Sequence, residues 1–407
     1  MKREGFAERE IIEYLLGEIR RGILEDQSLH GDEEIYDYIE ERVLQGGGHG
    51  RLPLGSRKKI IDYIFFTVRK ELGILQPYVE DEAVTEIMVN GDQNIFIEKG
   101  GSIQKLDMGF ISTEELEEII RRIAASVHRE INELNPIVDA RLKNGSRVHA
   151  VYKNVALNGP TLTIRKFPKK AFDMEDMIGF GTITREAGDF LRKMVVYGAN
   201  QFISGGTSSG KTSMLNVLSN FIPSQERIIV IEDSAELQIN SVENIVRMEC
   251  RNANVNGAGM VDMQQLIKAS LRMRPNRIIV GEVRGKEVLD MLQAFNTGHD
   301  GSLSTGHGNS VAGMLRRMEN MVMQAADFPV ESIREQIAEA VDIMVHMGRI
   351  PSGERKVLEI CEICGYSQGK YDINCLYSYH MEKGLLPTGN RLRNREKLML
   401  KGMCFDE

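Results

Sequence analysis

Residues 205–212 read Gly-Gly-Thr-Ser-Ser-Gly-Lys-Thr, and this stretch decides the fold class of the chain. It fits the pattern G-x-x-x-x-G-K-[ST] at every position. Glycines at this spacing let the backbone curl, so that successive amide hydrogens point at phosphate oxygens. The lysine adds a compact positive charge, and the last hydroxyl suits Mg²⁺. The sequence therefore predicts a phosphate-binding loop, which we call the P-loop. It consists of Gly205, Gly206, Thr207, Ser208, Ser209, Gly210, Lys211 and Thr212. Ser213, which follows it, is also expected to contact the nucleotide.

The segments on either side of the P-loop support this interpretation. Residues 202–204 predict a short strand before it, and residues 213–220 predict a helix after it. The N-terminus of that helix would add its positive dipole to the anion site. The alternative is a glycine- and serine-rich turn with a chance lysine, and the flanking elements argue against it.

Two apolar runs each lead into a carboxylate. Residues 228–231 precede Glu232, and residues 278–281 precede Glu282. Continuous β-branched runs are typical of strands buried on both faces of a mainly parallel sheet. Ligands gather at the carboxyl ends of such strands, so both carboxylates are expected beside the P-loop. One can hold the magnesium shell while the other orients an attacking water. The alternative is that both are ordinary acidic residues that open loops.

Two histidines lie in polar, glycine-rich segments. His299 is in Thr-Gly-His-Asp-Gly, and His307 is in Ser-Thr-Gly-His-Gly-Asn-Ser. Their surroundings suggest a phosphate sensor, but an ordinary surface histidine fits the spacing equally well.

The other regions are less specific. Residues 1–75 are charged and helical in pattern, whereas residues 76–168 predict an α+β region. This region has a hairpin around 90–93 and a capping box formed by Ser112 and Glu115. Residues 171–182 resemble a linker. The net charge of −8 speaks against a dedicated coat for duplex DNA. No apolar run approaches the ~18 residues of a spanning helix, and no secretory signal is evident, so a cytoplasmic protein is expected.

Together these motifs resemble the type II/type IV secretion ATPases, and within them the Tad (Flp) pilus assembly ATPases of CpaF type. The similar segments in the C-terminal half are 205–212, 231–237, 271–275, 281–285 and 296–302. Those in the N-terminal half are 85–91, 139–142, 145–148 and 159–167.

The resemblance implies an ATP- and Mg²⁺-dependent homohexamer at the cytoplasmic face of the inner membrane, where it acts on membrane platform proteins. It also implies a small helical region (1–75), a PAS-like α+β domain (76–170), a linker (171–182) and an α/β RecA-like ATPase domain (183–407). The roles that it implies for single residues are water activation by Glu232, metal binding by Thr212 and Glu282, a histidine box at His307, and contacts to the γ-phosphate from Arg147 and Arg165.

Three positions depart from the family pattern. Ser208 stands where many members have glycine, and little effect is expected because its backbone can still form a P-loop. Gly306 precedes His307 where an aliphatic residue is usual, which predicts a less rigid loop. Cys361 and Cys364 form a single pair rather than a four-cysteine zinc motif, so a reduced pair is favoured over zinc.

A second class of protein shares the same core. A nucleic-acid or conjugation motor also combines a P-loop with a RecA-like domain. The basic run 391–395 would suit it, although a solvated helix face is favoured there. The resemblance in the N-terminal half favours a secretion motor, for which no direct contact with nucleic acid is expected.

Overall fold

The computed structural model of this chain describes residues 4–26, 29–45, 54–166, 171–251 and 259–404. The last residue of the 159–167 motif and the predicted domain end at 170 lie outside these ranges. The chain divides into two compact units, Met1–Lys169 (unit 1) and Lys170–Glu407 (unit 2).

Unit 1 begins with the helices that the apolar spacing predicts. They are α1 (Glu4–Glu25), α2 (Asp32–Gln45), α3 (Leu54–Arg69) and the short α4 (Gln76–Glu80). Leu15 and Ile19, and likewise Ile35 and Ile39, are four residues apart and fully buried. Residues at this spacing share one helix face, so these helices bury a common apolar stripe.

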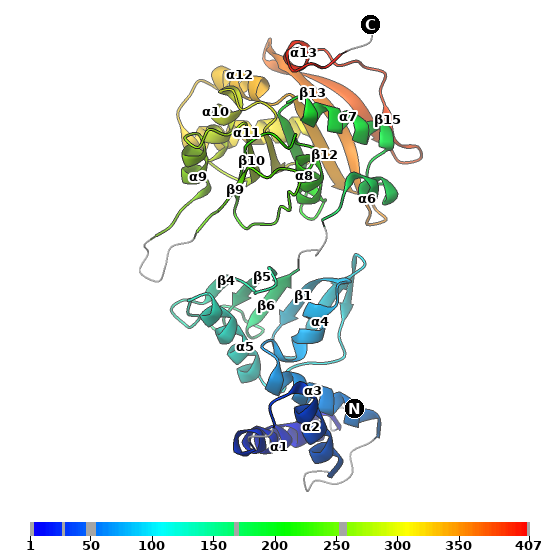
Figure 1. Ribbon diagram of the computed structural model, residues 1–407, viewed down its shortest axis with the longest axis vertical. Coiled ribbons are helices and arrows are strands. Elements are labelled where there is room, and N and C mark those ends of the chain that lie inside the picture. The colour runs from blue at the N-terminus through cyan, green and yellow to red at the C-terminus, as the bar shows by residue number, and fades with distance from the viewer. Residues whose placement is uncertain (1–3, 27–28, 46–53, 167–170, 252–258, 405–407) are drawn as a thin grey trace. The chain divides into compact units, whose positions relative to one another are not determined.

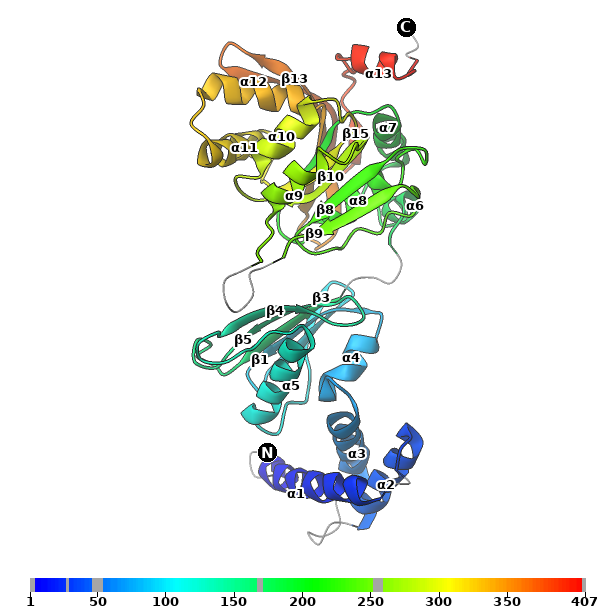
Figure 2. The ribbon, with the colours of Figure 1, turned by 60° about the vertical axis from the view of Figure 1, so that its left-hand side comes forward.

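A six-stranded antiparallel sheet completes unit 1, in the order β3-β2-β1-β6-β5-β4. The predicted hairpin around 90–93 is confirmed by the pairing of β1 with β2. Helix α5 (Thr113–Ser126) lies on the same side of the sheet as α4 (Figure 2). The strands are β1 (Val84–Asn90), β2 (Ile95–Lys99), β3 (Ser102–Lys105), β4 (Ile137–Arg141), β5 (Arg147–Val151) and β6 (Thr161–Arg165).

The capping box predicted for α5 is half correct. The Ser112 hydroxyl accepts from the amide of Glu115, as a capping residue does. The Glu115 carboxylate accepts from the Tyr63 hydroxyl and the Ile111 amide instead of the Ser112 amide. It therefore links α3 to α5 and ties the helical region to the sheet.

Unit 2 is built on a nine-stranded sheet with the order β15-β14-β13-β12-β7-β11-β10-β8-β9. The six strands from β12 to β9 in this order are parallel, and β13, β14 and β15 pair antiparallel. The three strands predicted around the P-loop and the two carboxylates are confirmed as β7, β8 and β10. The bounds are β7 (Gln201–Gly205), β8 (Ile228–Glu232), β9 (Ile245–Glu249), β10 (Arg277–Val283), β11 (Leu303–His307), β12 (Ile343–Arg349), β13 (Arg355–Ser367), β14 (Lys370–His380) and β15 (Gly384–Pro387).

Helices cover both faces of this sheet (Figures 1 and 2). One face packs on α6 (Met174–Gly179), α7 (Arg185–Val196) and α8 (Lys211–Ser219). The other packs on α9 (Met263–Ser270), α10 (Val288–Asn296), α11 (Val311–Ala325) and α12 (Val330–Ala340). Two apolar cores result, one on each side, and the predicted α/β fold class is confirmed. Within the described ranges, no helix is both long and apolar enough to cross a membrane.

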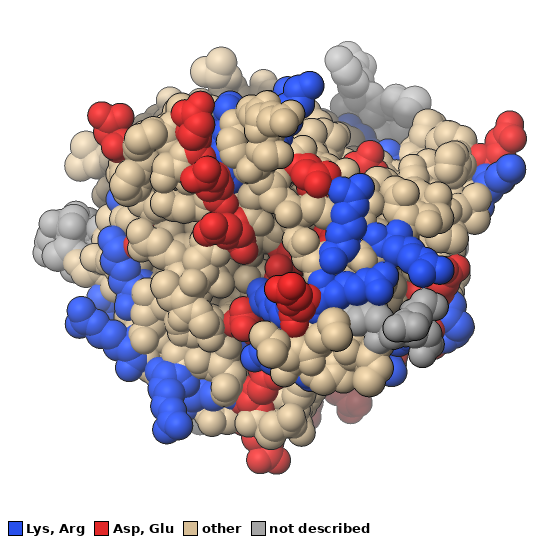
Figure 3. Space-filling model, turned by 90° about the horizontal axis from the view of Figure 1, so that it is seen from above, with Lys and Arg blue, Asp and Glu red and all other residues tan. Residues whose placement is uncertain are grey.

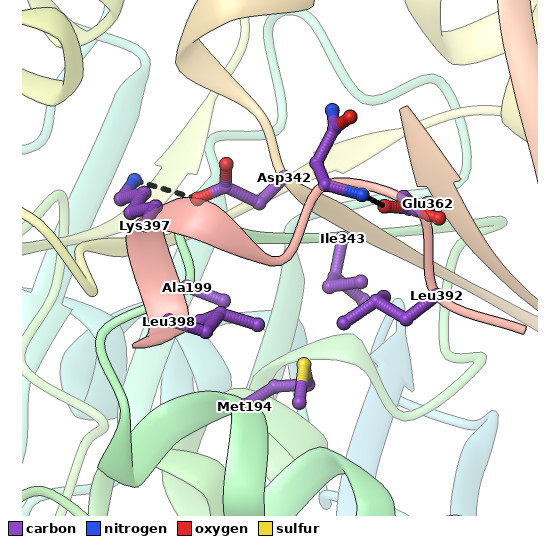
Figure 4. A pocket seen from close by; sticks show the side chains of 9 residues that line it. Met194, Ala199, Asp342, Ile343, Glu362, Leu392, Lys397 and Leu398 are labelled. Carbon is purple, nitrogen blue, oxygen red and sulfur yellow. Dashed lines mark hydrogen bonds and ion pairs between the residues drawn. The ribbon is translucent and has the colours of Figure 1, made fainter. Parts of the chain in front are cut away.

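The C-terminal segment is held against unit 2 by the buried carboxylate of Glu362 and the part-buried carboxylates of Asp342 and Asp300. The basic run 391–395 precedes α13 (Glu396–Leu400), so the predicted helix face is wrong there. Glu362 instead accepts from the backbone amides of Arg393 and Asn394. Lys397 Nζ donates to Asp342 Oδ2 at 2.7 Å (Figure 4). It also lies 3.0 Å from Asp300 Oδ1. Burial raises the pKa of the Asp342 carboxyl, which Lys397 and the Asn200 amide oppose.

Replacing Lys397 with methionine should therefore destabilise the protein by about 1–3 kcal/mol at pH 8, since it leaves the part-buried carboxylate of Asp342 without its cation. Without Lys397 the pKa of Asp342 rises further, so protonation relieves the charge and the cost shrinks as the pH falls towards 5. Urea denaturation followed by circular dichroism measures both effects. K401M is the matched control, because Lys401 is half exposed and 3.8 Å from Asp300. Equal losses in the two variants would contradict this anchoring role.

Candidate active site

The P-loop joins the end of β7 to the start of α8. The helix begins at Lys211, two residues before the predicted start, and Gly210 caps it with φ +97°. A Cβ on Gly205 would lie 2.5 Å from the carbonyl oxygen of Met347, so only glycine fits this close approach of β12. Close packing thus requires glycine at Gly205, and the left-handed backbone favours glycine at Gly210.

The inner side of the P-loop is lined by short polar contacts. Lys211 is 7% exposed, and its Nζ donates to the carbonyl oxygen of Gly206 at 2.8 Å. The Ser209 hydroxyl donates to the same oxygen. Ser208 adopts the left-handed region at φ +57°, which is where glycine is usually needed. Ser208 therefore carries its side chain on strained backbone.

Parallel pairing brings the predicted site residues to one edge of the sheet. The P-loop follows β7, and His307 ends the neighbouring β11. Glu282 lies near the end of β10, the next strand, and Glu232 ends β8, the one after it. Because these four strands run in the same direction, their carboxyl ends share one edge.

Glu282 is the centre of a charged cluster. Its Oε1 lies 2.8 Å from Nε2 of His307, and its Oε2 lies 2.7 Å from a terminal nitrogen of Arg284. Arg284 also reaches Asp233 at 3.7 Å, so it connects the ends of β10 and β8. Sequence reasoning did not select Arg284. Two signals mark it: it lies in the segment 281–285 that resembles the family, and it is two residues after Glu282, since alternate residues of an extended chain share a side.

Glu232 is less exposed to solvent than Glu282 and His307, which lie at the neighbouring strand ends. It is 3% exposed, and its Oε1 accepts from the amides of Glu236 and Leu237 at 2.8 and 3.0 Å. Burial raises the pKa of Glu232 to about 7, and the two amide hydrogen bonds oppose this rise. Its carboxyl group is therefore poised to change protonation near neutral pH.

The two candidate histidines lie at opposite edges of the sheet of unit 2. His299 lies in the loop before β11, at the opposite edge of the sheet, where its Nδ1 contacts the Ala294 carbonyl at 2.9 Å. His307 lies at the P-loop edge, where burial lowers its pKa and Glu282 opposes the shift. Gly306 sits within β11, where a Cβ would be 2.9 Å from both Met314 and Phe202. The expectation of a less rigid loop there is wrong, because tight packing occupies that space.

Unit 1 brings Arg147 and Arg165 together. They are directly opposite each other on β5 and β6, and Arg165 also faces Glu86 on β1. Directly opposed residues point to the same face of a sheet, so the two guanidinium groups share one side.

Metal ligands are sparse in the part of the chain that the structure describes. It contains no group of three or more His, Cys, Asp or Glu that could hold a metal ion. The five cysteines are free thiols, and Cys361 pairs across the strands with Cys375 rather than with Cys364. A magnesium ion would suit Thr212, at the start of α8, and Glu282 only together with phosphate oxygens.

The sequence matches the family described as Type II/IV secretion system protein over residues 68–374. It is 32% identical to the conjugal transfer protein TrbB of Rhizobium radiobacter, over 72% of this chain and 88% of that protein. It is 30% identical to the type IV secretion system protein PtlH homolog of Bordetella bronchiseptica, over 71% and 93%. The fold resembles the pilus retraction motor PilT with bound ADP, with a TM-score of 0.54, 19% identity and coverage of 81% and 86%.

The pKa of Glu232 predicts a pH-dependent effect of removing its charge. In the folded protein the pKa is raised to about 7 from 4.5, so ionisation costs stability as the pH rises through 7. E232Q should gain about 1–3 kcal/mol over wild type between pH 5 and pH 8. Calorimetry of both proteins across this range measures the difference. E243Q, at an exposed position before β9, should show no such trend. Parallel stability curves for wild type and E232Q would contradict the raised pKa.

Proposed function

We propose that this chain, which belongs to the Type II/IV secretion system protein family, is an ATP hydrolase that powers a machine of that kind. The convergence of the P-loop, His307, Glu282 and Glu232 at one sheet edge carries the proposal. ATP hydrolysis needs a cation for the phosphates, a carboxylate for the metal and a group that orients water. Lys211, Glu282 and Glu232 at this edge can supply these three.

The chain's own groups divide the work. Amides of the P-loop and the N-terminus of α8 hold the phosphates, and Lys211 neutralises their charge. Thr212 and Glu282 are the residues that would hold Mg²⁺, which supplies charge stabilisation on the phosphate oxygens when bound. Glu282 shares its oxygens with His307 and Arg284, so these two residues orient it. Glu232 keeps Oε2 available to orient water, because its Oε1 is held by the loop amides.

At the finer level, we propose a homohexameric motor for a Tad/Flp pilus of CpaF type. It would act on platform proteins from the cytoplasmic face of the inner membrane and power assembly of the pilus, with retraction as a second activity of the same motor. The motifs in both halves of the sequence and the family match, which spans both units, support this proposal. We also propose that the motor makes no direct contact with nucleic acid. The one face seen in Figure 3 carries both basic and acidic side chains.

A motor for conjugal transfer is the second candidate, because a relative at 32% identity bears that name. Deleting the gene separates the two functions. Loss of surface pili supports the pilus motor, and loss of DNA transfer to recipient cells with pili intact supports the conjugal one. Complementation with K211A should fail in either case.

Lys211 and Glu282 test the chemistry. K211A should lose ATP hydrolysis by ~10²-fold or more, because its charge has no substitute at the phosphates. E282Q keeps shape and loses charge, so it should retain nucleotide binding while turnover falls ~10²-fold. Phosphate release assays and nucleotide titrations measure these quantities, with circular dichroism to show an intact fold. Wild-type turnover in K211A would refute the P-loop assignment.

Arg147 and Arg165 test the contribution of unit 1. If they contact the γ-phosphate, the double alanine variant should weaken binding of an ATP analogue and leave ADP affinity nearly intact. Charge-assisted contacts of this kind are worth ~1.5–3 kcal/mol each. Side-by-side titrations of both nucleotides measure the difference, with R122A on α5 as the control. Equal losses for the two nucleotides would make these arginines structural.

A further inference from the structure

One exposed arginine outside the four strand ends contacts the P-loop. Arg355 is the first residue of β13, and its Nε donates to the carbonyl oxygen of Ser208 at 3.0 Å. Its side-chain stem lies along the loop, since a Cβ on Gly210 would be 3.5 Å from Cδ of Arg355. The contact joins residues 147 positions apart in the sequence.

The contact falls where the P-loop is strained. Ser208 holds a left-handed backbone, which is costly for any residue with a side chain. Its peptide group is planar, so fixing the Ser208 carbonyl also fixes the amide of Ser209, which points the opposite way. That amide turns towards the inside of the loop, where it lies 3.4 Å from the Gly206 carbonyl oxygen. The guanidinium of Arg355 therefore fixes the direction in which the Ser209 amide points.

The backbone beside Arg355 is well anchored. The amide of Val357 donates to the carbonyl of Thr182 at 2.8 Å, and both residues are buried. The Thr182 amide in turn donates to the Met177 carbonyl at the end of α6. A long exposed side chain loses conformational entropy when it is held in one hydrogen bond. Because the backbone next to Arg355 is already fixed, only the side chain itself must be ordered to contact Ser208.

We propose that Arg355 is a positioning residue for the P-loop, which it acts on by holding Ser208 in the left-handed conformation. The proposal rests on the proposed nucleotide-binding function. It also explains how a residue with a side chain is held at φ +57° in this loop. A glycine at 208 would adopt this conformation without strain and would need less support.

A double-mutant cycle tests the proposal. R355A should weaken the binding of both ADP and ATP five- to tenfold in the wild-type background, and less than twofold in the S208G background. R349A is the matched control, because Arg349 ends β12 directly opposite Arg355 and its Nε donates to the Gly353 carbonyl in the turn between the two strands. Fluorescent ADP and ATP analogues serve as probes, and thermal melting should show equal stability of R355A and R349A.

Hydrogen exchange gives a second readout that needs no nucleotide. In R355A, but not in R349A, the amides of residues 206–210 should exchange several-fold faster. Failure of the wild-type protein to bind nucleotide would refute the proposed function, and hydrogen exchange would still decide the role of Arg355. Wild-type exchange in R355A overturns the proposal. The proposal is also overturned if R355A loses nucleotide affinity in the S208G background as well, and loses more for ATP than for ADP. That result would mean that Arg355 contacts the phosphate directly.

Discussion

Parallel pairing of β7, β11, β10 and β8 is the constraint on which the rest of the structure depends. It aligns four carboxyl ends at one edge, about 4.8 Å apart from strand to strand. It brings together residues that are far apart in the sequence, since Gly205 and His307 are 102 positions apart. The apolar cores on both faces of the sheet hold the strands in this arrangement, so packing far from the edge sets its chemistry.

The elements that carry local signals were predictable. Continuous apolar runs indicated β8 and β10, and the glycine spacing indicated the P-loop between β7 and α8. Convergence of Glu232 and Glu282 followed from the rule that ligands gather at the carboxyl ends of parallel strands. The roles assigned to these residues stay predictions, whereas their positions at one edge are observed.

Contacts between distant polar side chains were not predictable. Arg284 bridges two strand ends, and Arg355 reaches Ser208 from the start of β13, 147 residues away, yet neither residue lies in a periodic pattern. Glu115 followed a capping pattern but bonded to Tyr63, because tertiary contact offered its carboxylate a better donor. The Arg391–Arg395 run looked like a helix face for a similar reason: its sequence carries no sign of the buried Glu362 that holds it extended.

The anchoring of the C-terminal segment has a mechanical consequence. Asp342, Asp300 and Asn200 precede β12, β11 and β7, at the edge of the sheet opposite the P-loop. Lys397 joins the first two of these, and the Asn200 amide donates to Asp342. A pulling force between the P-loop and the C-terminal segment thus runs along these strands. It must shear their ladder hydrogen bonds together rather than unzip them one at a time, so unit 2 would transmit load as a stiff body.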